Sequence, residues 1–110
     1  MFKKENRLVA GVSFSNSSKF NSPQFILKTK NNNSQINRFG IIVSKKVDKR
    51  AVARNKIKRI FREELVNCDK DMKKGYDILF IIRTGIIGKT KDEITLLIKE
   101  YLGKASVLSK

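Results

Sequence analysis

The unbroken apolar run Ile78–Ile82 constrains the fold more than any other segment of the chain. A strand with one solvated face alternates apolar and polar residues, whereas a run without alternation is typical of a strand covered on both faces. Asp77 and Arg83 bound this run. We therefore predict a central strand over 77–83, buried within a sheet.

Two shorter segments also have the composition of strands. Phe25–Lys30 opens with three apolar residues, and Phe39–Val43 contains two isoleucines and a valine. The residues between them, 31–37, are mostly asparagine and other loop formers. We predict that the two segments pair as an antiparallel hairpin with an open loop.

Two amphipathic helices are predicted from apolar residues at helical spacing. The first begins at Ala53, and its apolar positions are Ile57, Ile60, Phe61, Leu65 and Cys68. The second carries Ile94, Leu97, Ile98, Tyr101 and Leu102. Thr90 and Glu93 fit a capping box before the second helix, and Gly103 fits its C-cap. Strands separated by helices, too few for a barrel, predict one α+β domain over residues 1–110, a small sandwich with one sheet covered by helices.

The charge of the chain restricts its partners. Its 110 residues include 25 lysines and arginines against 10 acidic residues, a formal net charge of +15. Such a charge repels itself in the folded state, so it predicts a polyanionic partner, nucleic acid first and an acidic membrane second. No run approaches the ~18 apolar residues of a membrane span, and the N-terminus lacks the pattern of a secretory signal. We therefore expect a soluble, cytoplasmic protein.

Much of this charge lies in one string. Nine basic residues and one acidic residue, Asp48, fall between Lys45 and Arg62. On a helical wheel, Arg54, Lys58 and Arg62 form a ridge beside the apolar face, at spacing i, i+4 and i+8. Solvated helix faces normally mix both signs, so the cationic ridge indicates a surface that binds phosphates.

The string Arg54-Asn55-Lys56-Ile57-Lys58-Arg59-Ile60-Phe61-Arg62 resembles the signature of the bacterial ribonuclease P protein family. Arg38-Phe39-Gly40, Val43-Ser44-Lys45-Lys46-Val47 and Ala51-Val52 stand upstream in the family's order. The resemblance implies one mixed sheet of about four strands, with a left-handed βαβ crossover through the basic helix. It also implies a subunit of an endoribonuclease that removes the 5′ leader of precursor tRNA, a step in tRNA processing.

The same resemblance implies roles for single residues. The set expected to contact the catalytic RNA is Lys45, Lys46, Arg54, Asn55, Lys58, Arg59 and Arg62. The candidates for a cleft that holds the leader are Phe14, Phe20, Phe25 and Lys28, although a core role suits the phenylalanines at least as well. Magnesium is expected in the holoenzyme but not on the protein alone. The partners are then the catalytic RNA and precursor tRNA, with no membrane and no obligate protein partner.

The ends of the chain depart from the pattern. The segment 1–22 is shortened relative to the family, and Gly11 with neighbouring serines weakens a helix there, so we predict an irregular segment. Residues 104–110 are predicted to form a flexible tail.

The chain offers few groups for catalysis. It has no histidine, its carboxylates are scattered, and its single cysteine, Cys68, reads as a small apolar residue. We therefore expect no catalytic residues and no zinc site, with the hydrolysis performed by the RNA. The alternatives are a ribosomal or other structured-RNA-binding protein, or a DNA-binding helix.

Overall fold

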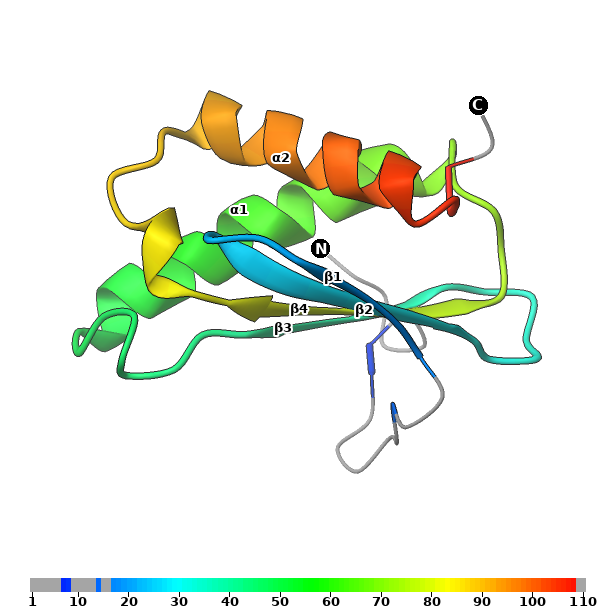
Figure 1. Cartoon of the computed structure of the whole chain (residues 1–110), viewed down its shortest axis with the longest axis horizontal. Helices are drawn as coiled ribbons and strands as arrows, with labels where there is room; N and C mark the ends of the chain where they lie inside the picture. The colour runs from blue at the N-terminus through cyan, green and yellow to red at the C-terminus, as the bar shows by residue number, and fades with distance from the viewer. Residues whose placement is uncertain (1–6, 9–13, 15–16, 109–110) are drawn as a thin grey trace.

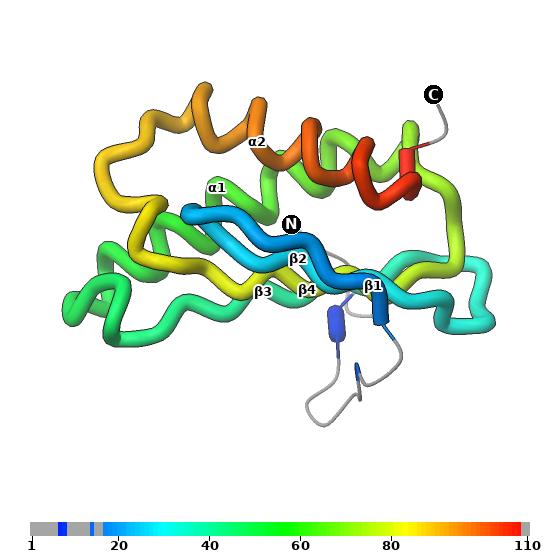
Figure 2. The backbone as a smooth tube through the Cα atoms, viewed as in Figure 1, coloured from blue at the N-terminus to red at the C-terminus, as the bar shows by residue number. Residues whose placement is uncertain are grey.

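The computed structural model describes residues 7–8, 14 and 17–108 of the chain. Four strands form one sheet, and two helices lie together on one of its faces (Figures 1 and 2). In chain order the elements are β1 (Ser18–Asn21), β2 (Phe25–Asn31), β3 (Arg38–Ile42), α1 (Ala51–Asp69), β4 (Tyr76–Ile82), the 3-10 helix η2 (Thr84–Ile86) and α2 (Lys91–Lys104). The predicted α+β architecture with one mixed sheet is confirmed.

The order of strands in the sheet is β1-β2-β4-β3. β4 runs antiparallel to β2 and parallel to β3, so its predicted central place is confirmed. The prediction that both faces of this strand are covered is wrong, because the helices lie on one face and Leu79 and Ile81 on the other are only half-buried. The predicted hairpin is wrong, because β4 lies between β2 and β3. The physical reason is that β4 is the most continuously apolar strand and gains most from a neighbour on each side. The 32–37 loop instead packs against the residue before β4, with the Asn32 N–H donating to the Gly75 carbonyl at 2.8 Å.

Helix α1 connects the parallel neighbours β3 and β4. It begins two residues before the predicted start at Ala53. The left-handed sense of this crossover stays a prediction from the family resemblance.

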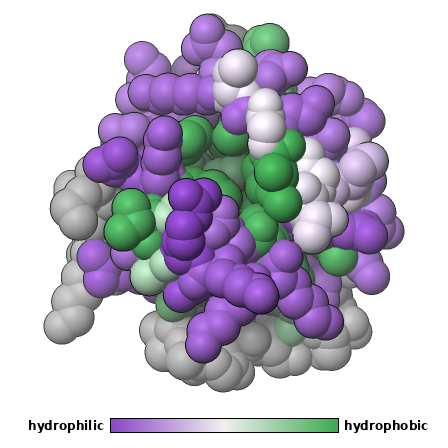
Figure 3. All heavy atoms as spheres, turned by 90° about the vertical axis from the view of Figure 1, so that its left-hand side faces the viewer, coloured by the Kyte–Doolittle hydropathy of each residue, from purple (hydrophilic) through white to green (hydrophobic). Residues whose placement is uncertain are grey.

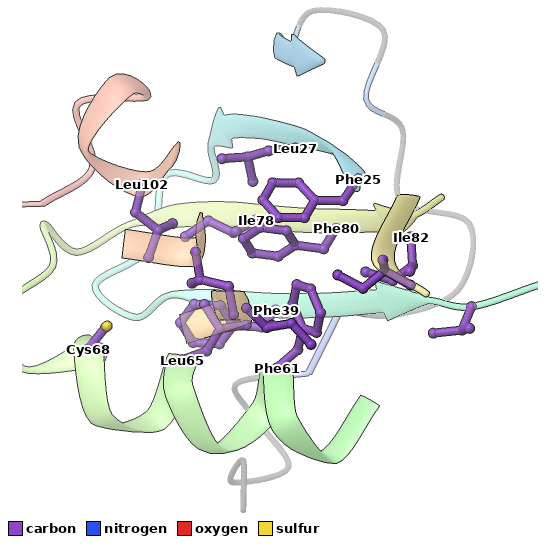
Figure 4. Packing of buried hydrophobic residues seen from close by; sticks show 14 of the residues in the cluster. Phe25, Leu27, Phe39, Phe61, Leu65, Cys68, Ile78, Phe80, Ile82 and Leu102 are labelled. Atoms are coloured by element: carbon purple, nitrogen blue, oxygen red, sulfur yellow. The ribbon is translucent and has the colours of Figure 1, made fainter. Parts of the chain in front are cut away.

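The core fills the space between the sheet and the two helices (Figure 4). Phe25 of β2 lies at its centre with no exposed surface. Its ring makes edge contacts with Phe61, Phe80 and Tyr101 at centroid distances of 5.9, 5.0 and 5.2 Å. Each such pair is worth about 0.5–1.5 kcal/mol beyond the area it buries, so the Phe25 ring joins the sheet to both helices.

The capping box at the start of α2 is confirmed. The Glu93 N–H donates to the Thr90 hydroxyl at 3.1 Å, and the Thr90 N–H donates to the Glu93 carboxylate at 2.9 Å. The predicted C-cap at Gly103 is wrong, since α2 continues through Lys104 and ends at Ala105. The left-handed residue there is Ser106, at φ 59°.

The predicted flexible tail over 104–110 is also wrong as far as residue 108. Val107 is fully buried, and Leu108 forms an antiparallel bridge with Met72. Val107 and Leu108 therefore close the core at this end, just beyond the last residue of α2. Residues 109–110 lie outside the described part of the chain.

Candidate nucleic-acid interface

The predicted RNA-contacting residues come from two adjacent elements, the 43–50 loop and helix α1. Lys45 and Lys46 are the central residues of a tight turn closed by a hydrogen bond from the Val47 N–H to the Ser44 carbonyl, at 3.1 Å. Val43 and Val47, on either side of the lysines, are buried. The lysines are exposed, so their backbone is anchored in the core while their ammonium groups face solvent.

On α1 the predicted residues lie in two groups, on the side away from the core and on the flank beside it. Asn55 and Arg59 are exposed, whereas Arg54, Lys58 and Arg62 are half-buried on the flank beside the core, as the helical wheel predicts. A shallow hollow follows the outward side and is lined by Val52, Asn55, Lys56, Arg59, Arg62 and Glu63. We call Lys45, Lys46, Arg54, Asn55, Lys58, Arg59 and Arg62 together the basic surface.

Arg54 differs from the other cations of the basic surface because its guanidinium is already engaged. One of its terminal nitrogens donates to the carbonyl of Asp48 at 3.1 Å and to that of Lys49 at 2.9 Å. These bonds tie the first turn of α1 to the loop that carries the lysines.

Most cations of the basic surface have no acidic partner. Six ion pairs form within the described part of the chain, and none of them includes Lys45, Lys46, Lys58, Arg59 or Arg62. Figure 3 views the end of the molecule that carries the 43–50 loop and the start of α1, where hydrophilic side chains surround an apolar centre. The charge of this end is therefore available to an external anion.

The start of α1 adds to the positive potential. Arg50 at the N-cap supplies no side-chain acceptor, and the first turn contains no acidic residue. Asp48 is occupied by Arg50, whose side chain and backbone N–H donate to it and lower the pKa of the Asp48 carboxyl. The free N–H groups of a helix start favour anions, in agreement with the lysines beside them.

A second surface is the side of the sheet away from the helices, which we call the outer sheet face. One row across it reads Lys19, Lys28, Leu79 and Gly40, each opposite the next. A neighbouring row is apolar except for its first residue and contains Asn21, Ile26, Ile81 and Ile42. The face thus presents cations beside aliphatic side chains.

The N-terminal segment reaches this face at two described places. The Leu8 N–H donates to the Phe39 carbonyl at 3.0 Å, and a Cβ on Gly40 would lie 2.9 Å from Leu8 Cδ1. The Lys30 ammonium lies 5.2 Å from the centre of the Phe14 ring, within the range of a cation–π contact. Gly40 therefore leaves room for the Leu8 side chain against the sheet.

The four residues predicted for a leader cleft do not share one surface. Lys28 is on the outer sheet face, and Phe14 contacts Lys30 of the same face. Phe20 lies opposite Leu27 on the helix side and packs against the core. Phe25 is fully buried, so the core interpretation holds for both Phe20 and Phe25. Lys19, which lies opposite Lys28 on the outer sheet face, was not among the predicted residues because no strand was predicted at 18–21.

Two buried titratable groups contact each other within α1. Glu64 and Cys68 are buried on α1, where the Cys68 thiol donates to Glu64 Oε2 at 3.0 Å. Burial, followed by this hydrogen bond to Glu64, raises the pKa of Cys68 to about 12. Among the described residues no group of three or more histidine, cysteine or acidic side chains could hold a metal ion, and no helix is long and apolar enough to cross a membrane.

The structure has one mixed sheet under two helices, with cations that lack acidic partners on a loop and a helix at one end. These features define the class of small basic proteins whose surface charge suits a polyanion. The profile of the family described as Ribonuclease P matches residues 2–106. The chain therefore belongs to the ribonuclease P protein family. It is a subunit of ribonuclease P, a ribonucleoprotein of tRNA processing.

Individual relatives agree with this assignment. The chain is 40% identical over 89 residues to the ribonuclease P protein component of Clostridium botulinum strain 657, covering 80% of this chain and 79% of the relative. It is 46% identical over 88 residues to that of Dehalococcoides mccartyi strain CBDB1, covering 80% and 71%. A solved variant of the Staphylococcus aureus RNase P protein, described as defective in mRNA degradation activity, superposes with a TM-score of 0.87 at 31% identity, covering 96% and 92%.

Proposed function

We propose that this chain binds the catalytic RNA of ribonuclease P through the basic surface and the 5′ leader of precursor tRNA through the outer sheet face. In this way it supports endonucleolytic removal of the leader. The observation that carries the proposal is the set of unpaired cations on a preformed loop and the adjoining helix.

Contact with the catalytic RNA is supported by the spacing of these cations. Lys58 and Arg62 are one helical turn apart on one flank, and Arg59 lies farther out on the same helix. Guanidinium groups bind phosphate oxygens through paired hydrogen bonds, and like charges one turn apart gain from an anion between them. An RNA backbone supplies phosphates at such intervals.

Leader binding is supported by the composition of the outer sheet face. Lys19 and Lys28 lie directly opposite each other on antiparallel strands, an arrangement that destabilises a sheet unless an anion offsets it. Aliphatic side chains such as Ile26 and Ile81 adjoin the lysines. Single-stranded RNA offers phosphates for the lysines and base faces for the apolar side chains.

We assign the hydrolysis to the RNA subunit. The basic surface consists of ammonium, guanidinium and amide groups, which bind phosphate but do not abstract a proton at neutral pH. We expect magnesium in the holoenzyme to be held by RNA, because the nearby carboxylates do not fit a metal site on the protein. Asp48 is bound to Arg50, and Glu63 pairs with Lys91 at 3.8 Å. The cytoplasmic location stays a prediction.

The proposal is tested by reconstitution. The protein is mixed with the cognate ribonuclease P RNA and a precursor tRNA at a magnesium concentration where the RNA alone is slow. We expect faster cleavage at the mature 5′ end, and tighter binding of precursor than of leaderless tRNA. A lack of stimulation, with the protein shown to be folded, would overturn the proposal.

A competition assay separates this proposal from the alternative RNA- and DNA-binding functions. Ribosomal RNA fragments and duplex DNA of equal length compete against the ribonuclease P RNA for the protein. Preference for the ribonuclease P RNA supports the proposal, because its binding requires a matching RNA shape as well as charge. Equal competition would indicate a general polyanion binder.

A further inference from the structure

One side chain of α1, that of Arg54, bonds to the loop that carries Lys45 and Lys46. The guanidinium bonds to the Asp48 and Lys49 carbonyls, at 3.1 and 2.9 Å, span six and five residues of the chain. Each of these carbonyls can rotate away only by losing its bond to Arg54. The loop conformation is therefore coupled to the side chain of a residue on the helix.

Other contacts set the rest of this loop. The buried Val43 and Val47 fix its ends, and the Ser44–Val47 hydrogen bond closes the lysine turn. Asp48 accepts from the Arg50 N–H at 2.9 Å and from the Arg50 guanidinium. The backbone of residues 48–49 is held from the helix side by Arg54, which completes the bonding of the loop.

We propose that Arg54 is a positioning residue: it orders the lysine loop for RNA rather than binding a phosphate itself. The inference rests on the proposed contact between the basic surface and the catalytic RNA. Both bonds come from one terminal nitrogen of Arg54, so this nitrogen is committed to the loop carbonyls rather than to a phosphate. Fixing the loop before binding lowers the conformational entropy lost when Lys45 and Lys46 meet the RNA.

The two roles differ in what a charge-conserving variant does. Arg54→Lys keeps the positive charge, but its side chain is shorter and does not bring its nitrogen to the place of the guanidinium nitrogen that bonds to both carbonyls. If Arg54 binds phosphate, Arg54→Lys keeps the slope of log K against log salt that the native chain shows. If Arg54 positions the loop, Arg54→Lys lowers this slope as much as Arg54→Ala does.

The test measures the salt dependence of binding to the ribonuclease P RNA for the full-length protein. Each lost phosphate contact lowers the slope of log K against log salt by about 0.7–0.9. We expect both Arg54→Lys and Arg54→Ala to lower the slope by about twice this amount, because both loop lysines are misplaced. A drop of one contact for Arg54→Ala and none for Arg54→Lys would overturn the inference.

A double-mutant cycle gives a second measurement. In the Arg54→Ala background, replacing Lys45 and Lys46 by alanine should cost little further affinity, because the two changes disrupt the same contact. The control is Lys58→Ala, which has no bond to the loop and should add to the lysine changes. Additive costs with Arg54→Ala would overturn the inference but leave the proposed function intact. No effect of replacing Lys45 and Lys46 on affinity would also overturn the inference, and it would remove these two lysines from the proposed RNA contact.

Unfolding in urea shows whether the Arg54 variants remain folded. We expect the transition midpoint to move little, since the bonds lie at the surface of a loop. Hydrogen exchange at the amides of 47–50 should accelerate in both Arg54→Ala and Arg54→Lys. Unchanged exchange there would contradict the positioning role.

Discussion

Arg38 and Asp77 form a two-pronged ion pair across the parallel strands β3 and β4. Arg38 Nε lies 2.7 Å from Asp77 Oδ1, and a terminal nitrogen of Arg38 lies 2.7 Å from Oδ2. Asp77 is fully buried and also accepts from the Asn32 amide at 3.0 Å. Hydrogen bonding to Asp77 raises the pKa of Arg38. One carboxylate thus joins β4 to both the start of β3 and the loop after β2.

Replacing Asp77 by alanine should be strongly destabilising. It leaves the Arg38 guanidinium and the Asn32 amide without their acceptor, and breaking a buried pair costs about 3–5 kcal/mol. We expect the low end of that range, because the Arg38 side chain is 29% exposed and can turn toward water. Urea unfolding measures the loss. Glu100→Ala, which breaks only the exposed pair with Lys104, serves as the control and should cost less than about 0.5 kcal/mol.

Single alanine substitutions at Lys58, Arg59 and Arg62 should each weaken binding to the ribonuclease P RNA. Each should lower the salt slope by up to about 0.7–0.9, the value for one phosphate contact. Lys70→Ala removes the same charge at the far end of α1 and is the matched control. If Lys70→Ala lowers the slope as much as the others, net charge rather than the basic surface determines binding.

Lys28→Gln should change stability and leader binding in opposite directions. Removing the repulsion with Lys19 should raise the free energy of unfolding by a few tenths of a kcal/mol, the scale of a cross-strand charge pair. The same change should reduce the preference for precursor over leaderless tRNA, since a phosphate contact is lost. Binding of the ribonuclease P RNA should not change. A leader preference equal to that of the native chain would remove Lys28 from the leader site.

Cys68 should be unreactive in the folded protein. Its thiol is buried and its pKa is raised to about 12, so thiolate is scarce at neutral pH. We expect a thiol reagent to modify the protein slowly under native conditions and rapidly in urea. Modification at equal rates in both conditions would contradict the buried position.

The same thiol makes stability depend on pH. The folded-state pKa lies above the ordinary value of 9.0, so the thiol's contribution is fully present below pH 9 and is lost as pH rises toward 12. The free energy of unfolding of the native chain should therefore fall relative to Cys68→Ala over this interval. Parallel curves for the two proteins would contradict the prediction.

The capping box of α2 should contribute stability without affecting RNA binding. Thr90→Ala removes the acceptor for the Glu93 N–H and should cost about 1 kcal/mol.

The same capping box makes stability depend on acid pH. The hydrogen bond from the Thr90 backbone N–H lowers the pKa of Glu93 below 4.5, so the contribution of Glu93 to stability is present above pH 4.5 and is lost as pH falls through the lower folded value. Glu93→Gln should flatten the acid limb of the unfolding curve. Reduced RNA affinity in Thr90→Ala would indicate a second role for this end.

The periodicity of apolar residues located the helices and the central strand. It did not predict which strands pair with each other in the sheet. The unbroken apolar run placed β4 at the centre of the sheet, and helical spacing placed both helices. The pairing of β2 with β3 was wrong, because strand patterns carry no information on which strands become neighbours. β1 was not predicted because Ser18-Lys19-Phe20-Asn21 has only one apolar residue. Its hydrogen-bonded pairing with β2, rather than its composition, holds this segment as a strand.

The site was predictable to the same degree. The helical wheel placed Arg54, Lys58 and Arg62 beside the apolar face, where the structure has them half-buried, because side-chain direction follows from helical geometry alone. The bonds of Arg54 were not predictable, since they depend on the path of the preceding loop. Phe25 has the same composition signal whether it stacks on RNA or packs in a core, and only its edge contacts with Phe61 and Phe80 decide for the core.

The place of β4 between β2 and β3 has a consequence for synthesis. β4 comes last of the four strands, yet it supplies the neighbour of β3 and the inner neighbour of β2. A growing chain therefore exposes α1 and its cations before the sheet beneath them can close, because the closing contacts are distant in sequence. Until residues 76–82 have left the ribosome, the chain carries the cations of α1 without the sheet that fixes their positions. We expect the full affinity for RNA to arise only after that point.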